Sequence, residues 1–210
     1  EEAIFLDIAH KLPRLMGPSG TVIDIGPGLG PLAEKIAATC SDQAHRLVLV
    51  DSPEMLSHSP DGDLIRKVPG QFPQNADGVN QAAPDGADVV IIYSVLHYIF
   101  PETTVDRFLA ATAGLLRPGG AMLIGDIPNF SKRRRFFCSA AGLQFHRAFT
   151  GRDEDPDDAV IGEAEGQITD TVLLQMLAGF RDQGYDAYIL PQADDLPMAN
   201  RREDILIKRP

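Results

Sequence analysis

The sequence contains few cysteines. Cys40 and Cys138 are the only two among 210 residues, and their separation matches no metal-binding motif. Zinc modules and small disulfide-stapled domains need more cysteines than this. Two cysteines in a chain of this length are typical of reduced thiols, so we expect a cytoplasmic protein.

Long apolar runs are also missing. No stretch approaches the roughly 20 apolar residues of a membrane span. The first ten residues, EEAIFLDIAH, have neither the basic segment nor the apolar core of a secretory signal. We therefore expect no membrane partner.

Basic residues are scarce relative to acidic ones. The chain has 19 Lys and Arg against 30 Asp and Glu, which gives a net charge of −11. Such a balance argues against nucleic acid and anionic lipid as partners, because both repel an acidic surface. The length and the 44% hydrophobic content suit one α/β domain, so we interpret residues 1–210 as a single domain.

Strand-like and helix-like segments alternate along the chain. Apolar runs predict strands at 21–25, 46–51, 64–68, 87–94, 121–127, 185–190 and 203–210. Helical spacing predicts helices at 30–40 and 168–183, and a further helix that Thr103 or Thr104 opens. This alternation predicts a mainly parallel, doubly wound sheet.

Residues 128–166 interrupt the alternation. The segment shows no clean periodicity, and it holds a basic run, SKRRRFF, followed by an acidic run, GRDEDPDD. A loop-rich stretch of this length inside a compact domain is usually functional or disordered. We expect an inserted lid here, rather than a second domain.

The stretch VIDIGPGLG, residues 22–30, carries the strongest chemical signal. Gly26, Gly28 and Gly30 follow a predicted strand, where absent side chains allow a ligand to approach the backbone. A dinucleotide motif, G-x-G-x-x-G, would need glycine at position 31, which is Pro31. The glycines therefore predict a nucleoside site of another kind, although a tight turn alone is the simpler alternative.

Two carboxylates define the ligand further. Asp24 stands beside the glycine turn, where it would repel a phosphate and attract an ammonium group. Asp51 ends the second predicted strand, 25 residues after Gly26, where an acid accepts hydrogen bonds from a ribose diol. A cationic nucleoside without phosphate fits this pattern, which indicates S-adenosylmethionine and disfavours NAD.

At this point the chain resembles the class I S-adenosylmethionine-dependent methyltransferases. Four motifs carry the resemblance in the family's order: VIDIGPGLG, LVLVDSPEML, ADVVIIYSVLHYI and LLRPGGAMLIGDI. The resemblance covers residues 20–127 and resumes with the final helix and two strands. It implies an α/β, doubly wound, Rossmann-like sheet of seven strands with the last strand antiparallel, and a lid insertion after the fifth strand.

The resemblance also implies a set of cofactor-binding residues. They are Asp24, Gly26, Pro27, Gly28 and Gly30 for the methionine part, Asp51 for the ribose, Ser52, Met55, Gln71 and Phe72 for the adenosine, and Ser94 near the ammonium group. Simpler roles stay open for some of them. Asp51 would also serve as a helix cap, Met55 and Phe72 as core residues, and Ser94 as a structural residue.

Three residues are candidates for catalysis. His97 follows the fourth predicted strand, and His146 lies in the predicted lid; either is a candidate base for a hydroxyl acceptor. Asp126 ends the fifth strand, where it would orient the acceptor or cap a turn. Metal-dependent relatives use further acids near the fourth strand, which this sequence lacks, so we expect no metal.

The sequence says less about the acceptor. The basic residues 132–135 suggest a grip on an anionic small molecule, or else a solvated helix face. The run from Asn129 to Phe149 resembles lids of bacterial methyltransferases from surface-sugar gene clusters. We therefore expect O-methylation of a sugar, a nucleotide-linked sugar or a related bacterial metabolite. N-methylation of a small amine and a non-catalytic nucleoside-binding protein are the alternatives.

Overall fold

Seven strands form one continuous sheet. The computed structural model describes residues 1–100, 103–112, 114–162 and 166–210. The strands are β1 (Thr21–Ile25), β2 (Arg46–Asp51), β3 (Ile65–Pro69), β4 (Ala87–Tyr93), β5 (Leu116–Pro128), β6 (Asp186–Pro191) and β7 (Arg202–Lys208). Their order is β3-β2-β1-β4-β5-β7-β6, and β7 is antiparallel to both of its neighbours. The predicted doubly wound sheet is confirmed.

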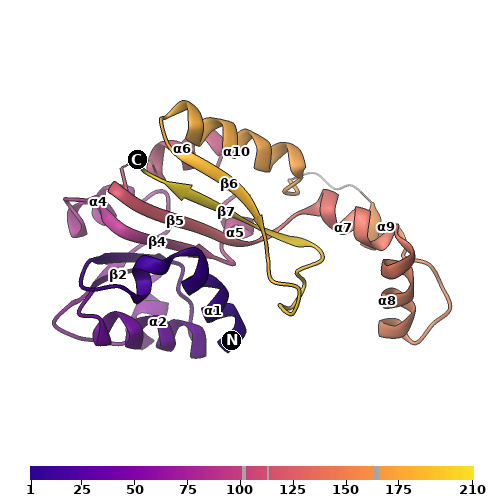
Figure 1. The fold of residues 1–210 in the computed structure, drawn as a ribbon, viewed down its shortest axis with the longest axis horizontal. Coiled ribbons are helices and arrows are strands. Elements are labelled where there is room, and N and C mark those ends of the chain that lie inside the picture. Colours follow the sequence, from indigo (N-terminus) through magenta and orange to yellow (C-terminus); the bar gives the residue numbers. More distant parts are fainter. Residues whose placement is uncertain (101–102, 113, 163–165) are drawn as a thin grey trace.

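Helices cover both faces of the sheet (Figure 1). One face carries α1 (Glu2–Lys11), the short 3₁₀ helix η1 (Pro13–Met16), α2 (Pro31–Asp42) and α3 (Pro53–His58). The other carries α4 (Ala76–Ala82), α5 (Leu96–Ile99), α6 (Val105–Thr112) and α10 (Asp170–Asp182). Alternation along β1 serves both cores, because Val22 packs under α1 while Ile23 packs toward the opposite layer.

One predicted boundary is confirmed, and another differs from the prediction. Thr104, and not Thr103, caps α6, because its Oγ1 accepts a hydrogen bond from the backbone N–H of Arg107. The strand predicted at 121–127 begins earlier than expected, because β5 starts at Leu116. Leu116 already pairs with Ala87 of β4, and the backbones of Gly119 and Gly120 both bond to Arg209, so the strand continues through this irregular segment.

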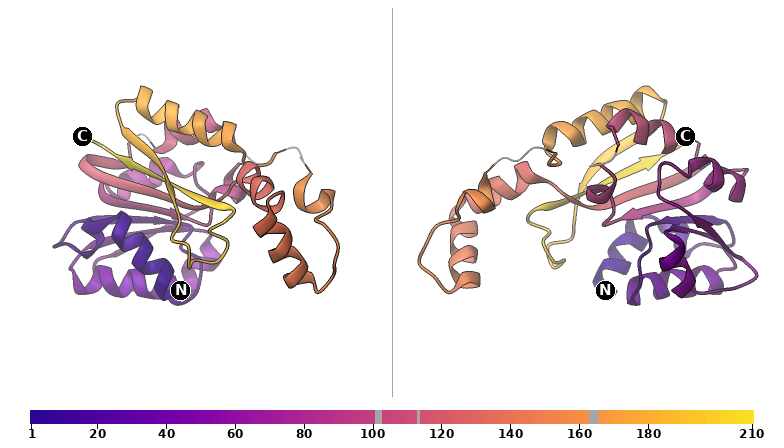
Figure 2. Two further views of the ribbon diagram at one scale, coloured as in Figure 1. Left: turned by 45° about the vertical axis from the view of Figure 1, so that its right-hand side comes forward. Right: turned by 180° about the vertical axis from the view of Figure 1, so that it is seen from behind.

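The segment expected to be loop-rich is helical instead. It contains α7 (Phe130–Phe137), α8 (Ala140–Thr150) and α9 (Asp158–Ile161), which we call the α7–α9 arm. Asn129 and Ser139 cap α7 and α8 through their side chains, and Gly151 ends α8 in the left-handed conformation. Figure 2 shows the arm projecting away from the sheet beyond the end of β5. Because the arm packs on itself rather than on the sheet, its sequence carries no core-facing stripe.

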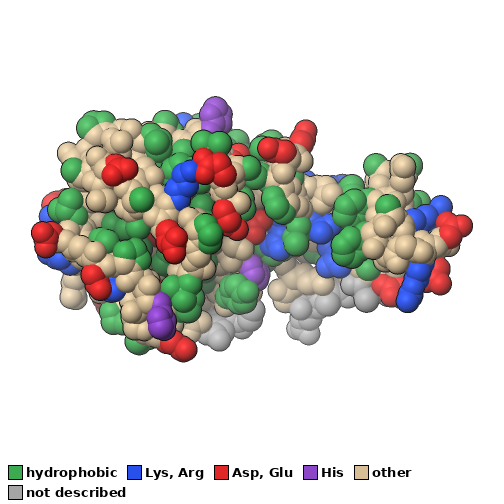
Figure 3. Space-filling view, turned by 90° about the horizontal axis from the view of Figure 1, so that it is seen from below, with side chains coloured by type: hydrophobic (Ala, Val, Ile, Leu, Met, Phe, Trp, Pro, Cys, Tyr) green, Lys and Arg blue, Asp and Glu red, His purple; other side chains and the backbone are tan. Residues whose placement is uncertain are grey.

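Charge is unevenly placed on the surface. Seen from below, Lys and Arg side chains gather where the sheet meets the arm, whereas Asp and Glu are scattered over the sheet domain (Figure 3). Within the described part of the chain, no helix combines the length and apolarity that crossing a membrane requires.

Candidate functional site

A large cavity lies at the carboxyl ends of the parallel strands. It has a volume of about 790 Å³, within the range of about 300–1,000 Å³ usual for small-molecule sites. Its walls come from the β1–α2 turn, the ends of β2, β4 and β5, the start of α5 and residues 196–198. A doubly wound sheet binds ligands at this edge. We call it the larger cavity.

The glycine turn forms one wall of the larger cavity. Gly26, Gly28 and Gly30 all have positive φ, at 69°, 64° and 140°. A Cβ added to Gly26 would lie 2.6 Å from Val95, so packing requires glycine there. A Cβ on Gly28 or Gly30 would meet no atom within 4 Å. At these two positions a side chain would point into open space. Because glycine has none, a ligand can approach the backbone of this turn, including Pro27.

Asp51 is held at the rim of that turn. Its carboxylate accepts hydrogen bonds from the backbone N–H groups of Ser52 at 2.7 Å and Gly28 at 3.4 Å. Ser52, and not Asp51, caps α3, because its Oγ accepts from the N–H of Met55. Helix capping was the alternative role for Asp51, and Ser52 fills it. Asp51 lines the larger cavity and does not cap α3.

Asp24 lies in the interior beside this wall. It is only 3% exposed and is not among the residues that line the larger cavity. Burial, together with the nearby charge of Asp51, raises the pKa of Asp24 to about 7. Asp24 therefore lies behind the wall of the larger cavity rather than among its lining residues.

The ends of β4 and β5 are strained toward the larger cavity. Ser94 and Asp126 have positive φ, at 59° and 54°, and Ser94 Oγ donates a 2.8 Å hydrogen bond to Asp126. Met198, which also lines the cavity, has a φ of 65°. Non-glycine residues held in this conformation cluster at functional sites. Ser94 thus has both a structural bond and a place in the wall.

The remaining predicted cofactor residues lie on the opposite wall. Met55, Gln71 and Phe72 all line the larger cavity. Phe72 is also part of the core, where its ring meets Phe108 edge-on with centroids 6.1 Å apart. Met55 is half-buried and does not belong to the core. Phe72 is a core residue that also lines the larger cavity.

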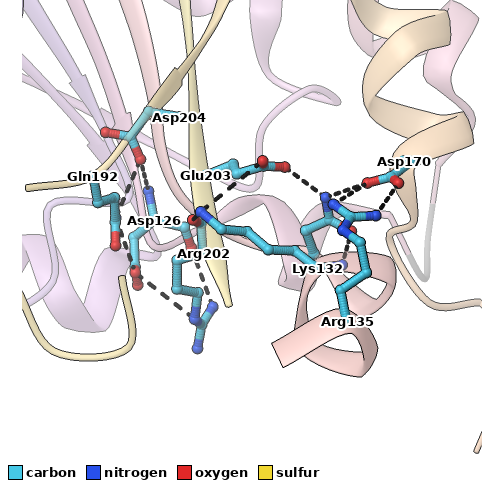
Figure 4. A network of polar contacts seen from close by, with 9 residues as sticks. Asp126, Lys132, Arg135, Asp170, Gln192, Arg202, Glu203 and Asp204 are labelled. Atoms are coloured by element: carbon cyan, nitrogen blue, oxygen red, sulfur yellow. Dashed lines mark hydrogen bonds and ion pairs between the residues drawn. The ribbon is translucent and has the colours of Figure 1, made fainter. Parts of the chain in front are cut away.

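A polar network fixes Asp126 from behind (Figure 4). Asp204 accepts the backbone N–H of Asp126 at 2.9 Å and also bonds to Lys11 and Gln192. The Arg202 guanidinium donates to the carbonyl of Asp126 and lies 3.8 Å from its carboxylate. These bonds hold Asp126 in its strained conformation.

A second cavity, of about 290 Å³, adjoins this network. Its lining consists of His97, Phe100, Pro128, Asn129, Phe130, Arg133, Gly166, Gln167, Ile168, Arg201 and Arg202. The two cavities are neighbours, because the rings of His97 and Tyr98 lie 4.1 Å apart and Tyr98 lines the larger cavity. Burial and the charge of Arg202 lower the pKa of His97, while Asp126 opposes the shift.

His146 lies apart from this site. It belongs to α8, lines neither cavity, and packs edge-on against Phe137 within the arm. The structure therefore brings His97 and Asp126 together but leaves His146 elsewhere. In the described part of the chain, no group of three or more His, Cys, Asp or Glu is arranged to hold a metal ion.

The basic run of residues 132–135 divides into different roles. Lys132 donates to the carbonyl of Arg202 at 2.7 Å, and Arg135 pairs with Asp170. Arg133 lines the second cavity, whereas Arg134 is exposed. Within the acidic run, Asp153 and Asp155 pair with Arg147 of α8.

Sequence reasoning missed the connection between β6 and β7. Leu196, Pro197 and Met198 line the larger cavity, and Arg201 lines the second. Because β6 runs in the same direction as β5, its following loop must lie at the carboxyl edge of the sheet. The antiparallel last strand was therefore the signal that this connection borders the site.

Comparison with known proteins indicates the class. Residues 23–124, from β1 to β5, match the methyltransferase domain family. This segment contains the glycine turn, Asp51 and the strained end of β4, on the sheet topology described above. Over these residues the chain is similar to that family, in line with the resemblance to class I S-adenosylmethionine-dependent methyltransferases that its sequence motifs carry.

Solved structures agree with this fold. The chain is 16% identical to the N-methyltransferase NodS from Bradyrhizobium japonicum, with a TM-score of 0.56, covering 99% of this chain and 97% of that one. A SAM-dependent methyltransferase from Archaeoglobus fulgidus is 13% identical, with a TM-score of 0.58 and coverages of 99% and 94%.

A third similar structure contains ligands. It is the 1,6-didemethyltoxoflavin-N1-methyltransferase from Burkholderia thailandensis, with bound 1,6-didemethyltoxoflavin and S-adenosylhomocysteine. It is 19% identical, with a TM-score of 0.53, and the alignment covers 100% of this chain and 79% of that one. No curated protein matches the sequence.

Proposed function

We propose that the larger cavity binds S-adenosylmethionine and that the chain transfers its methyl group to a small-molecule acceptor. One observation carries the assignment: the Asp51 carboxylate stands free of helix capping at the rim of a bare glycine turn. A carboxylate accepts both hydroxyls of a ribose diol. Gly28 and Gly30 leave room for the methionine part, and Met55, Gln71 and Phe72 surround the adenine.

Calorimetry tests the cofactor site. S-adenosylhomocysteine should bind the wild-type chain more tightly than NAD, because Pro31 and Asp24 disfavour a pyrophosphate. Asp51→Asn should weaken that binding by about 1.5–3 kcal/mol, the usual worth of hydrogen bonds to a charged group. Asp63→Asn, a change of the same type at an exposed position, is the matched control and should leave affinity unchanged. Tighter binding of NAD, or equal affinities in both variants, would contradict the site.

The arrangement also assigns roles in methyl transfer. Bound S-adenosylmethionine supplies an electrophilic methyl group on its sulfonium. The protein then has to hold the acceptor in line with that group, which is where most of the acceleration arises. Asp126 and Tyr98 line the larger cavity, and their partners Arg202 and His97 line the second, so we place the acceptor beside Asp126 and Tyr98. His97 lines the second cavity beside Tyr98. Burial and the charge of Arg202 lower its pKa, so one ring nitrogen is unprotonated at pH 7 and can accept a proton.

A hydroxyl acceptor is the candidate that requires a general base such as His97. A hydroxyl must lose a proton during methyl transfer, and the neutral imidazole accepts it. We therefore infer O-methylation of a small hydroxyl-bearing metabolite, such as a sugar or a nucleotide-linked sugar. Turnover of labelled S-adenosylmethionine with metabolite extracts tests for an enzyme; cofactor binding with no turnover on any extract would favour a non-catalytic nucleoside-binding protein.

N-methylation of a small amine is the second candidate. Two of the similar structures are N-methyltransferases, NodS and the Burkholderia enzyme. A neutral amine is itself a nucleophile and needs no base in the transfer step. Replacement of His97 therefore distinguishes the two acceptor types, as set out below.

A further inference from the structure

The second cavity has an unusual electrostatic lining for so acidic a protein. Three arginines, Arg133, Arg201 and Arg202, face it together with His97, and none of its described lining residues is Asp or Glu. The chain as a whole carries a net charge of −11. Cations gathered in a hollow against that background attract an anion.

Buried polar atoms in this cavity lack partners. Within the described residues, Nη1 of Arg201, Oε1 of Gln167 and Nδ1 of His97 are buried without a hydrogen bond, and all three residues line the second cavity. A buried donor or acceptor left unpaired costs about 1–3 kcal/mol. A ligand with polar oxygens would satisfy the arginine and histidine nitrogens at once.

Two carboxylates of the described residues near the second cavity have partners of their own. Asp170 pairs with Arg135 and accepts from Asn129 at 2.7 Å. Glu203 accepts from Asn129 at 2.5 Å and lies 4.0 Å from Lys132 (Figure 4). These two acids are thus held by residues around the base of the second cavity.

Arg201 is positioned by packing rather than by an acid. Its guanidinium lies 5.6 Å from the ring centre of Phe137 and 5.9 Å from that of Phe145, both in the arm. Burial and the charges of Arg133 and Arg202 lower its pKa. A site that brings like charges together without a ligand is electrostatically unfavourable, and an anion relieves that repulsion.

We propose that the second cavity binds an anionic oxygen group, a phosphate or a carboxylate, on the acceptor, through Arg201 and Arg133. This inference rests on the proposed function, because it places the acceptor's reactive end in the larger cavity and its anionic end in the second. His97 lines the second cavity beside Tyr98, which lines the larger one, so the two cavities are neighbours. The acceptor class is therefore a phosphorylated or carboxylated small molecule.

Inorganic phosphate and acetate are the probes that test this site. Each is titrated into the chain with and without saturating S-adenosylhomocysteine, while NMR follows the side-chain N–H signals of arginine. Saturable binding is expected for at least one probe, unchanged by the cofactor product. Arg201→Gln should weaken that binding at least about tenfold, because a charge-assisted bond is lost. Arg134→Gln, an exposed neighbour on α7, is the matched control and should change it less than twofold.

Further measurements distinguish a misfolded variant from a failure of the anion site or of the cofactor assignment. Arg133→Gln repeats the test without disturbing the ring contacts of Arg201, and thermal unfolding verifies that each variant is folded. The proposal is overturned by non-saturable binding of both probes, by competition with S-adenosylhomocysteine, or by unchanged binding in folded Arg201→Gln and Arg133→Gln. If phosphate binds as expected while S-adenosylhomocysteine does not bind, the anion site stands and the proposed function fails.

Discussion

At the scale of single residues, the two carboxylates near the glycine turn have different environments. Asp51 accepts two backbone N–H bonds at the rim of the larger cavity, whereas Asp24 is buried beside the wall. Both are acids that the sequence places next to the cofactor. Their burial gives them different chemistry, since burial and Asp51 raise the pKa of Asp24 to about 7.

Cofactor binding should therefore depend on pH through Asp24. The ammonium group of S-adenosylhomocysteine favours the ionised form of Asp24, whose population grows as pH rises through 7. Affinity should increase about tenfold between pH 6 and pH 8, in proportion to the ionised fraction. Calorimetry across this range measures it, and Asp24→Asn should remove the dependence. A wild-type affinity that is flat in pH would contradict this role.

The stability of the cofactor-free chain should change in the opposite direction. The folded-state pKa of Asp24 is raised above its unfolded value of 3.8, so the folded state binds the extra proton between these two values. The contribution of Asp24 to stability is thus complete below pH 4 and is lost as pH rises through 7. Urea unfolding of wild type and Asp24→Asn at pH 5 and pH 8 isolates this effect, and an equal difference at both pH values would exclude it.

Replacement of His97 tests the chemistry of the acceptor. With a hydroxyl acceptor, His97→Gln should lower kcat about 100-fold or more while cofactor affinity is kept. His146→Gln is the matched control, because His146 lines neither cavity. The wild-type rate should rise with pH around an inflection below 6.5, since burial and Arg202 lower the pKa of His97.

The opposite results identify other mechanisms. Near-normal rates in both variants would indicate an amine acceptor that needs no base. A selective loss in His146→Gln would mean that the arm moves over the larger cavity during catalysis, as a lid does.

At the scale of elements, Asp204 joins three separate parts of the chain. From β7 it binds Lys11 of α1, the backbone of Asp126 at the end of β5, and Gln192 after β6. Its side chain is completely buried. The strained end of β5 is therefore held by partners that are distant in sequence.

Asp204→Asn should destabilise the fold. The amide keeps the size of the side chain but loses the charge that binds Lys11 at 2.8 Å. We expect a loss of about 1.5–3 kcal/mol in the free energy of unfolding, measured with urea. Asp186→Asn, an exposed change on β6, should stay within about 0.5 kcal/mol. Equal stabilities of the two variants would show that the buried contacts contribute little.

The elements were predictable to different degrees. Apolar runs such as residues 87–94 located the strands to within a few residues, because strands buried on both faces leave an unmistakable composition. The α7–α9 arm was not recognised as helical. Its cap residues, Asn129 and Ser139, are present in the sequence, but its aromatic rings pack on one another and create no regular apolar stripe.

At the scale of the whole molecule, two kinds of site occur side by side. The cofactor wall comes largely from motifs that follow single strands, so Gly28 and Asp51 were identifiable one motif at a time. The second cavity assembles residues from the end of β4, the start of α7 and the β6–β7 connection. Gln167 and Arg201 belong to no motif, and only folding brings them together with His97.

The arrangement of the arm also emerges only from the fold. Among the described residues that line the larger cavity, none belongs to the α7–α9 arm, which projects beyond the sheet (Figure 1). Phe130 and Arg133 of α7 line the second cavity but not the larger one. The segment predicted as a lid thus contacts the second cavity, while residues 196–198 border the larger one.

The most direct measurement is a crystal structure of the chain with S-adenosylhomocysteine. We expect the nucleoside in the larger cavity, with both ribose hydroxyls within hydrogen-bond distance of Asp51 and the amino-acid part against Gly28 and Gly30. The sulfur should point toward the junction of His97 and Asp126. Density for the ligand at any other place, or a ribose that does not contact Asp51, would contradict the central claim.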